Sequence, residues 1–440
     1  EGGRRVEAVR IGIVPVLDRS WGGMYQYSVS FVLGLSELGL DDEFVVFASH
    51  DVPVPDEIRA GPYEVAIMPE FDRLRAVRRM FGKALPPSVI SWLARIAHAS
   101  RGRDTTAGRA KLLATDTAWR EWFARFEVDL LVFTVESDIA FRTGLPYVVS
   151  IHDLQHRQQP GLPEFSHESD WERREYRMRN SIANAAVVLV DSDMGKQDLL
   201  EHYGDTGIDP EYVMPFRSSP AHYLSAVPTD AEIAAVRKRY SLPDRYLFYP
   251  AQFWPHKNHR RIIEALGLLA DDGMRPHLVL AGSASGRLRH QTFLDVMRTA
   301  SHLGVAEQVH YLGYVPDDDM KALYSRAETL VMPTFFGTTN IPVIEAWHFD
   351  CPVVTSDLRG LREQVDGAAV LVDPSSAPSI ADGIRQVVSD EDLRKDLIRR
   401  GREQIATYTH DDYLVRLGEV LEAAKRRTSE ARGLSGRPAS

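Results

Sequence analysis

Two loops in this chain, one in each half, combine glycine with polar residues where an apolar run ends. The first contains Gly22 and Gly23, after the run Arg10–Val14 and before a helix expected to begin near Met24. Paired glycines let backbone amides approach a phosphate closely, and a helix N-terminus adds partial positive charge. The residues match neither the GxGxxG fingerprint nor a Walker A sequence, so a tight turn with no ligand is the alternative.

The second loop follows the apolar run Thr329–Met332 and precedes Pro342. It consists of Gly337, Thr338, Thr339 and Asn340. Proline is favoured in the first turn of a helix, so a helix is predicted to begin near Ile341, with the loop amides converging on its N-terminus. Glu345 lies one turn into this helix, where its carboxylate can accept paired hydrogen bonds from a diol such as ribose. The alternative is that Glu345 only offsets the helix dipole.

The elements that position these loops are short runs rich in Val, Ile, Leu and Phe, which alternate with helix-like segments. In the first half they are Arg10–Val14, Phe44–Ala48, Glu64–Met68, Asp129–Phe133, Pro146–Ile151 and Val187–Val190. In the second half they are Tyr246–Tyr249, His277–Ala281, Val309–Leu312, Thr329–Met332, Val353–Thr355 and Val370–Val372. Continuous apolar strands separated by helices indicate parallel sheets covered on both faces. The repetition therefore predicts a doubly wound α/β architecture.

A segment rich in proline and serine, Pro215–Pro228, separates the two series of strands, and Thr229 and Glu232 follow it at the spacing of a capping box. The predicted divisions are an N-terminal domain (1–225), a C-terminal domain (226–405), a closing amphipathic helix (406–426) and a disordered tail rich in Arg, Gly and Ser (427–440).

Composition restricts the class of protein. The 440 residues include 52 Lys and Arg against 62 Asp and Glu, and the net charge of −10 argues against general nucleic-acid binding. The single cysteine, Cys351, excludes an intramolecular disulfide and is typical of a reducing compartment. No apolar run reaches the roughly 18 residues of a membrane-spanning helix. We therefore expect a globular protein of the cytoplasm.

The segment 72–111 differs from the rest because it carries ten basic residues against two acidic ones, with apolar residues between them. One interpretation is peripheral contact with a membrane surface or with an anionic acceptor. The other is two ordinary amphipathic helices whose arginine faces are solvated.

The second loop and its neighbours resemble a known family. Residues 332–345 resemble the donor-site motif of the retaining GT-B glycosyltransferases of family 4. The segments that fit in the same order are Trp21–Gly23 (glycine loop), Ser150–Leu154 (H-D-L turn), Tyr249–Asn258 (phosphate loop) and Val309–Val315 (strand beside the base). The resemblance spans residues 10–425. It implies two Rossmann-like domains facing each other across a cleft, with a C-terminal helix crossing back.

The resemblance also implies roles for individual residues. Lys257 would bind the donor diphosphate, Glu345 the ribose hydroxyls, and His152 the transferred sugar and the phosphate near the reaction centre. Gly23 would supply a backbone amide to the departing phosphate. The other residues expected in the donor site are Gly22, Gln252, Asn258, Gly313, Gly337, Thr338, Thr339, Asn340 and Ile341.

Two positions depart from the family's pattern. Gly337 stands where a glutamate usually touches the transferred sugar, and Gln252 stands where an arginine usually binds phosphate. Losing a cation beside a diphosphate costs about 2–4 kcal/mol of transition-state stabilisation unless another residue replaces it. His256, His259 and Arg260 are the replacements that the sequence suggests.

The activity implied is retaining transfer of a sugar from a nucleotide-diphosphate donor to a hydroxyl acceptor: a glycan, a lipid-linked acceptor or a small molecule. Such a transfer is drawn as front-face attack and needs no enzyme nucleophile. The alternatives are a non-catalytic scaffold that binds a sugar nucleotide, favoured by Gly337 and Gln252, and a GT-B nucleotide-sugar epimerase or hydrolase.

No cofactor and no metal are expected. Asp191-Ser192-Asp193 has a D-x-D spelling, but it follows a strand and opens a helix, so Ser192 or Asp193 is interpreted as an N-cap. His152 and Asp153 are adjacent on an extended segment and point to opposite faces, so their side chains are not expected to pair.

Overall fold

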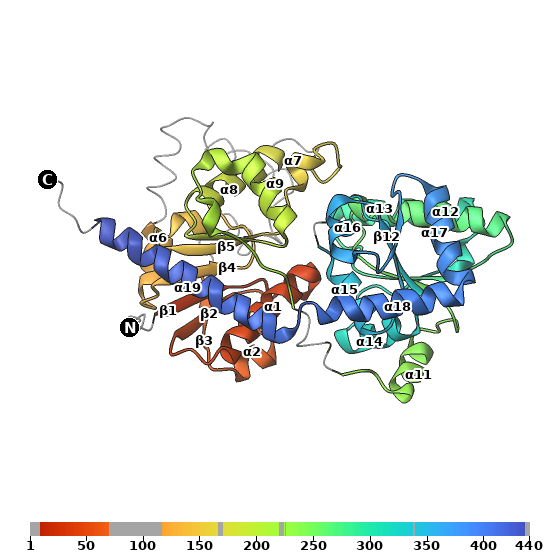
Figure 1. Ribbon diagram of the computed structural model, residues 1–440, viewed down its shortest axis with the longest axis horizontal. Coiled ribbons are helices and arrows are strands. Elements are labelled where there is room, and N and C mark those ends of the chain that lie inside the picture. The colour runs from red at the N-terminus through yellow and green to blue at the C-terminus, as the bar shows by residue number, and fades with distance from the viewer. Residues whose placement is uncertain are drawn as a thin grey trace, which may run out of the picture.

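The computed structural model describes residues 9–69, 117–165, 170–219, 224, 226–337 and 339–435, which fold into two lobes (Figure 1). Each lobe contains one parallel sheet with helices on both of its faces. This is the doubly wound α/β architecture that the alternating apolar runs predict.

Two of the predictions concern residues outside those ranges. The basic segment 72–111 and Thr338 are not among the described residues, so the expected membrane or acceptor contact stays a prediction. Within the described ranges, none of the helices combines the length and the apolar character needed to cross a bilayer.

The first sheet has seven parallel strands in the order β3-β2-β1-β4-β5-β6-β7. They are β1 (Arg10–Val14), β2 (Glu43–Ser49), β3 (Glu64–Met68), β4 (Leu130–Phe133), β5 (Tyr147–Ile151), β6 (Val187–Val190) and β7 (Val213–Pro215). The helices around it are α1 (Gly23–Glu37), α2 (Asp56–Ala60), α6 (Thr117–Ala124), α7 (Gln155–Gln158), α8 (Asp170–Ala183) and α9 (Asp193–Tyr203). Two apolar cores, one on each face of the sheet, hold these helices in place.

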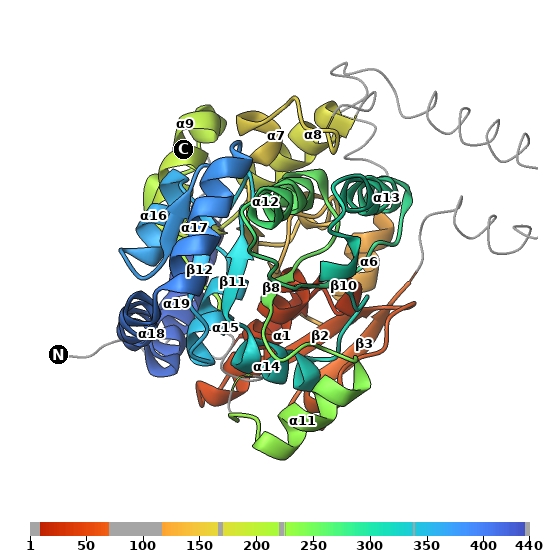
Figure 2. The ribbon, with the colours of Figure 1, turned by 90° about the vertical axis from the view of Figure 1, so that its right-hand side faces the viewer.

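The second sheet has six parallel strands in the order β10-β9-β8-β11-β12-β13. They are β8 (Leu247–Pro250), β9 (Leu278–Ala281), β10 (Val309–Tyr311), β11 (Thr329–Met332), β12 (Val353–Ser356) and β13 (Val370–Val372). Figure 2 shows α12 (His259–Asp271), α13 (Arg287–His302) and α17 (Ala377–Ser389) on one face, and α14 (Asp317–Arg326), α15 (Ile341–His348) and α18 (Glu391–Ala406) on the other. The remaining helices are α11 (Asp230–Arg239), which begins at the predicted Thr229–Glu232 capping box, and α16 (Arg359–Val365).

Each sheet reverses its strand order once, which fixes where a ligand can bind. In the first sheet β1 pairs with both β2 and β4, and in the second β8 pairs with both β9 and β11. Loops that leave such strands in opposite directions open a crevice at their carboxyl ends. The loops at these two places carry most of the predicted site residues, whereas His152 follows β5 and Gly313 follows β10.

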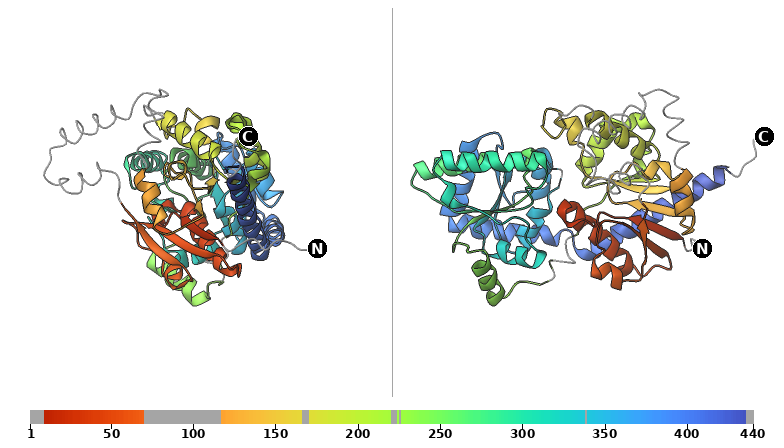
Figure 3. Two further views of the ribbon diagram at one scale, coloured as in Figure 1. Left: turned by 90° about the vertical axis from the view of Figure 1, so that its left-hand side faces the viewer. Right: turned by 180° about the vertical axis from the view of Figure 1, so that it is seen from behind.

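The chain crosses back to the first lobe through α19 (His410–Ser435), as Figure 1 and the right-hand view of Figure 3 show. Tyr413, Leu417, Val420 and Leu421 of α19 belong to the core that covers one face of the first sheet. A side chain at Gly34 of α1 would lie 3.0 Å from Tyr413 and Leu417, so glycine permits the close approach of the two helices.

Two boundaries differ from the predictions. β7 joins the first sheet as a three-residue edge strand just where the predicted linker begins, and its last residue, Pro215, suits an edge position. The closing helix ends at Ser435 rather than at residue 426, so the prediction that residues 427–435 are disordered is wrong. The guanidinium of Arg427 lies 4.7 Å from the centre of the Tyr212 ring, and Thr428 bonds to the Ala424 carbonyl at 2.8 Å. These contacts hold a segment whose composition alone predicts disorder.

Candidate functional site

Loops from the carboxyl ends of both sheets contact one another across the crevice. The side-chain amide of Gln252, after β8, donates to the carbonyl of Ser20, after β1. A Cβ placed on Gly23 would lie 3.5 Å from Ile341, the first residue of α15. The predicted glycine loop and the predicted second loop are therefore brought together, although 317 residues lie between Gly23 and Ile341 in the chain.

The glycine loop has a backbone that other residues rarely adopt. Gly22 has φ +57° and ψ −117°, and it is the residue from which α1 begins. A side chain there would be strained whatever the space around it, and it would approach Gln252 Nε2 at 3.6 Å. Gly22 thus leaves the start of α1 uncovered on the side that faces the second lobe.

The second loop ends at Asn340, which precedes α15, and Pro342 stands in the first turn as predicted. The backbone of Asn340 is clamped by Gln364 of α16, whose side chain accepts from its N–H and donates to its carbonyl, both at 2.9 Å. A Cβ on Gly337 would clash with the carboxamide of Asn340. The Asn340 carboxamide thus occupies the space that a side chain at position 337 would take, and a larger residue there would require the carboxamide to move.

The carboxamide of Asn340 is 5% exposed, and its Nδ2 has no hydrogen-bond partner within the described residues. Thr339 and Ile341 line a neighbouring pocket of about 320 Å³, which lies between α15, α16 and the connection from α18 to α19. The loop therefore presents a buried donor next to open space, as expected of a binding loop.

Glu345 lies on the first turns of α15 and is 9% exposed. The hydroxyl of Tyr324, on α14, donates to Glu345 Oε2. Tyr324 is itself buried, so this bond fixes the orientation of the carboxylate. The position is compatible with the predicted binding of a diol.

Lys257 ends the short 3-10 helix that follows β8. Burial lowers the pKa of Lys257 to about 8, although the carboxylate of Asp153 opposes this shift. Asp153 is the described carboxylate that acts on the Lys257 ammonium, and it already forms an ion pair with Arg174 at 2.5 Å. The site therefore carries excess positive charge, which favours an anionic ligand.

Asn258 supports this loop. Its backbone is left-handed, with φ +60°, and its carboxamide donates to the carbonyls of Pro333 and Pro374, each at 2.7 Å. Both amide protons are thereby used within the protein. Asn258 therefore holds Lys257 in place, and its side chain is not aimed at a ligand.

Gly313 lies just after β10 of the same lobe, with φ +73°. Its carbonyl accepts from the N–H of Gly282 at 2.7 Å. Gly282 in turn lies so close to the Ala251 carbonyl that any side chain would clash. The loops after β8, β9 and β10 are thus packed into one unit beside the crevice.

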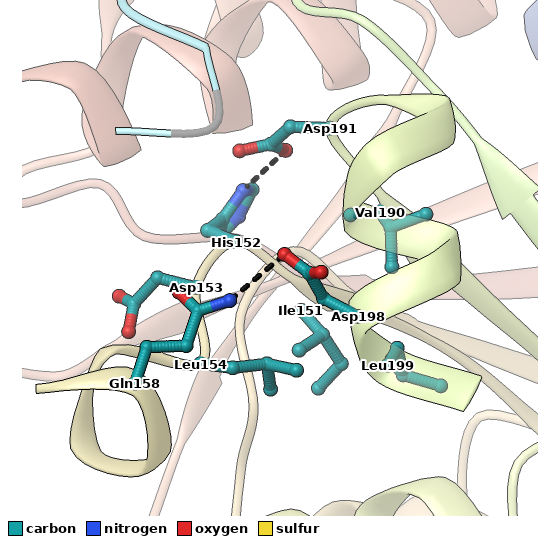
Figure 4. Close-up of a pocket in the computed structure, with 10 residues that line it drawn as sticks. Ile151, His152, Asp153, Leu154, Gln158, Val190, Asp191, Asp198 and Leu199 are labelled. Atoms are coloured by element: carbon teal, nitrogen blue, oxygen red, sulfur yellow. Dashed lines mark hydrogen bonds and ion pairs between the residues drawn. The ribbon is translucent and has the colours of Figure 1, made fainter. Parts of the chain in front are cut away.

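His152 follows β5 and is held through both ring nitrogens. Figure 4 shows the contact of its ring with Asp191. Nδ1 lies 2.9 Å from Asp191 Oδ1, and Nε2 lies 2.8 Å from the carbonyl oxygen of Thr134. Carboxylate and carbonyl oxygens only accept hydrogen bonds, so both nitrogens must donate and the ring is a charged imidazolium. Burial alone would lower the pKa of His152, but Asp191 and these bonds outweigh it and raise the pKa to about 9.

The sequence did not predict a functional role for Asp191, because the D-x-D pattern of residues 191–193 was interpreted as a helix N-cap. The expected N-cap is confirmed at Ser192, which accepts from Gly195 N at 3.0 Å. Asp191 itself turns to His152. The strand register explains the contact. Ile151 of β5 pairs with Val190 of β6, so the residues that follow them, His152 and Asp191, lie side by side.

Asp153 has different partners from its neighbour. Its carboxylate binds Arg174 and the N–H of Gln155, so the prediction that His152 and Asp153 do not pair is confirmed. Beside them is a small hollow, lined among others by Leu154, Gln158 and Asp198 (Figure 4).

The three suggested replacements for a phosphate-binding arginine are engaged elsewhere. Glu164 Oε1 accepts from the backbone N of His256 at 3.0 Å and lies 2.9 Å from its Nδ1, which links the two lobes. Burial lowers the pKa of His259 to about 3, so this ring is neutral. Arg260 is exposed and pairs with Glu264 at 3.0 Å. None of these residues adds a free positive charge to the crevice.

The described parts of the chain contain no group of three or more His, Cys, Asp or Glu side chains placed to hold a metal ion.

Comparisons with known proteins agree with this geometry. Residues 233–404 match the family model described as glycosyl transferases group 1. O-antigen chain mannosyltransferase B of Escherichia coli is 28% identical over 253 residues, which is 57% of this chain and 64% of that protein. Alpha-D-kanosaminyltransferase of Streptomyces kanamyceticus is 24% identical over 255 residues, with the same shares. The chain thus spans slightly less than two thirds of the length of these relatives.

Solved structures match over nearly the whole chain. A glycosyltransferase from Rickettsia africae ESF-5 has a TM-score of 0.65 at 15% identity and covers 96% of this chain and 99% of its own. HepE from Anabaena, in complex with UDP and glucose, has a TM-score of 0.62 at 14% identity and covers 94% and 98%. These likenesses confirm the predicted GT-B fold.

Proposed function

We propose that this protein, whose residues 233–404 match the model of the glycosyl transferases group 1 family, moves a sugar from a nucleotide-diphosphate donor to a hydroxyl acceptor. The observation that carries the proposal is the excess positive charge in the crevice. Lys257 lies in the loop after β8, and the imidazolium of His152 follows β5. The loop that leads into α15 contacts the Lys257 loop, because the N–H of Phe335 bonds to the carbonyl of His256 at 2.8 Å. Cations and a helix N-terminus together suit a diphosphate.

In the proposed reaction, the bond between the sugar's anomeric carbon and the diphosphate oxygen breaks, and the acceptor oxygen bonds to that carbon from the same face. The acceptor's proton passes to the leaving phosphate oxygen. His152 supports this assignment because both of its nitrogens already carry protons and donate them, so its ring has no lone pair with which to act as a base. The configuration of the sugar is retained.

We propose that Lys257, His152 and the amides at the start of α15 offset the charge of the leaving diphosphate, without a metal and without a cofactor. Preorganised donors of this kind contribute about 3–4 kcal/mol each when removed singly from an enzyme. For the acceptor we propose a glycan, because two relatives are named as O-antigen chain mannosyltransferases.

A thermal-shift screen against UDP, GDP and ADP tests the donor, because a ligand that binds the folded state raises its apparent stability. The matching nucleotide sugars are then incubated with and without oligosaccharide acceptors. We expect a glycosylated product only when the acceptor is present. Release of free sugar, or of an epimerised nucleotide sugar, without any acceptor would instead identify a hydrolase or an epimerase.

Replacing Glu345 with alanine is expected to weaken binding of the preferred ribonucleoside diphosphate by about 10- to 100-fold, because two hydroxyl groups lose a charged acceptor. The matched control is the 2′,3′-dideoxy form of the same nucleotide, which lacks both hydroxyls and should bind the wild type and Glu345→Ala equally. Calorimetric titration measures all four affinities. If Glu345→Ala keeps the wild-type preference for ribose, Glu345 only offsets the helix dipole.

A further inference from the structure

Arg289, on the first turn of α13, has a guanidinium group held in a defined position. Its NH1 donates to Gln252 Oε1 at 2.5 Å, and its guanidinium carbon lies 5.0 Å from the centre of the Trp254 ring. A Cβ on Gly286 would lie 3.5 Å from Arg289 NH2, so the glycine leaves space along one edge of the group. An amide oxygen, an indole face and a glycine therefore fix a side chain that is flexible in solution.

The charge of this guanidinium is not neutralised within the described residues: no ion pair of Arg289 is found there, and both of its side-chain partners are uncharged. Arg298, farther along the same helix, shows the contrast, because it lies 3.8 Å from Asp295. A half-buried cation that is positioned but lacks a counter-ion is a common arrangement for binding an external anion.

Gln252 connects this cation to the crevice. Its Oε1 accepts from Arg289 while its Nε2 donates to the carbonyl of Ser20, two residues before Gly22. Nε2 also lies 3.6 Å from the position of a Cβ on Gly22. The guanidinium is thus one side chain away from the glycine loop of the opposite lobe.

The loop that carries Gln252 is also the loop that carries Lys257. The N–H of Trp254 bonds to the Gln252 carbonyl at 2.8 Å, and the N–H of Lys257 bonds to the Trp254 carbonyl at 2.9 Å. These bonds make a compact turn, so the position of the Arg289 guanidinium is set relative to Lys257 by a single short segment. Two cations positioned by one loop match the two phosphates of a diphosphate better than one cation does.

We propose that Arg289 binds the diphosphate of the nucleotide donor together with Lys257, and that Gln252 is the positioning residue that aims it. The inference rests on the proposed function. It explains how position 252 can be uncharged in this chain: the guanidinium comes from α13, and glutamine has both the acceptor needed to hold it and the donor needed to reach Ser20.

The test compares Arg289→Gln with the control Arg298→Gln on the same helix. Affinities are measured by calorimetric titration for the nucleoside diphosphate among UDP, GDP and ADP that stabilises the wild type most, and for the corresponding nucleoside. We expect Arg289→Gln to weaken the diphosphate at least tenfold and the nucleoside less than twofold. Arg298→Gln should match the wild type with both ligands.

A reciprocal exchange makes the test independent of any general damage to the fold. The double variant Gln252→Arg with Arg289→Gln puts the guanidinium at position 252, and we expect it to recover diphosphate affinity to within about threefold of the wild type. Undiminished diphosphate binding by Arg289→Gln, an equal loss for the nucleoside, or no recovery in the double variant would each overturn the inference while leaving the proposed function intact. A wild type that binds none of the three diphosphates would overturn both.

Discussion

Replacing Lys257 with methionine is expected to lower the rate of sugar transfer by about 100-fold, because a preorganised charge is lost where negative charge develops. Methionine keeps the length and the apolar stem of the side chain, so packing is retained. The ammonium is costly to bury, as its pKa of about 8 shows. The variant should therefore unfold at the same temperature as the wild type or at a higher one.

The same pKa gives a pH dependence whose sign can be stated. An amine carries its charge below its pKa, so the wild type should lose affinity for the nucleoside diphosphate as the pH rises through about 8. Lys257→Arg stays charged and should not show this loss. The control Lys238→Met removes an exposed lysine of α11 and should leave transfer unchanged. Near-normal turnover in Lys257→Met would contradict the proposed role.

Asp191→Asn is expected to reduce transfer at least tenfold near pH 7.5 and to recover much of it near pH 5.5, since asparagine keeps an acceptor for His152 Nδ1 but removes the negative charge. Without that charge, burial dominates and the pKa of His152 falls from about 9 to its ordinary range or below. The ring then loses a proton at neutral pH. Full pH–rate profiles and the imidazole resonances of His152 measure the two effects separately.

Asp193→Asn is the matched control, because Asp193 is exposed two residues farther along and opens α9. Asp193→Asn should show the wild-type pH–rate profile.

The pH dependence of the free energy of unfolding gives a second readout. A histidine whose pKa is raised on folding contributes stability that is complete below about pH 6.5 and is lost as the pH rises through about 9. Asp191→Asn should remove this part of the pH dependence. A loss of activity that is equal at every pH would indicate a structural role for Asp191 alone.

The sequence predicted those features that depend on local pattern. The apolar runs, the capping box at Thr229 and Pro342 in the first turn of α15 all correspond to the observed elements. Each follows from the period, cap or dihedral preference of residues close together in the chain.

The features that were not predicted depend on how distant segments pack. Asp191 meets His152 only through the register of β5 and β6, and Glu164 meets His256 only because the two lobes approach each other. Arg289 lies 37 positions from Gln252 in the chain, and no local pattern joins them. Likewise, the sequence shows only that Gly337 lacks a side chain. The structure adds that the carboxamide of Asn340 occupies the space which such a side chain would take.

The return of α19 to the first lobe has a consequence for biosynthesis. Translation proceeds from the N-terminus, so the ribosome completes the seven strands of the first sheet long before it adds Tyr413, Leu417 and Leu421, which finish one of that sheet's cores. The ion pair between Asp42 and Lys425, at 2.6 Å, joins the earliest and latest parts of that lobe. The nascent first lobe must therefore remain incomplete, with apolar surface uncovered, until the second lobe has been synthesised.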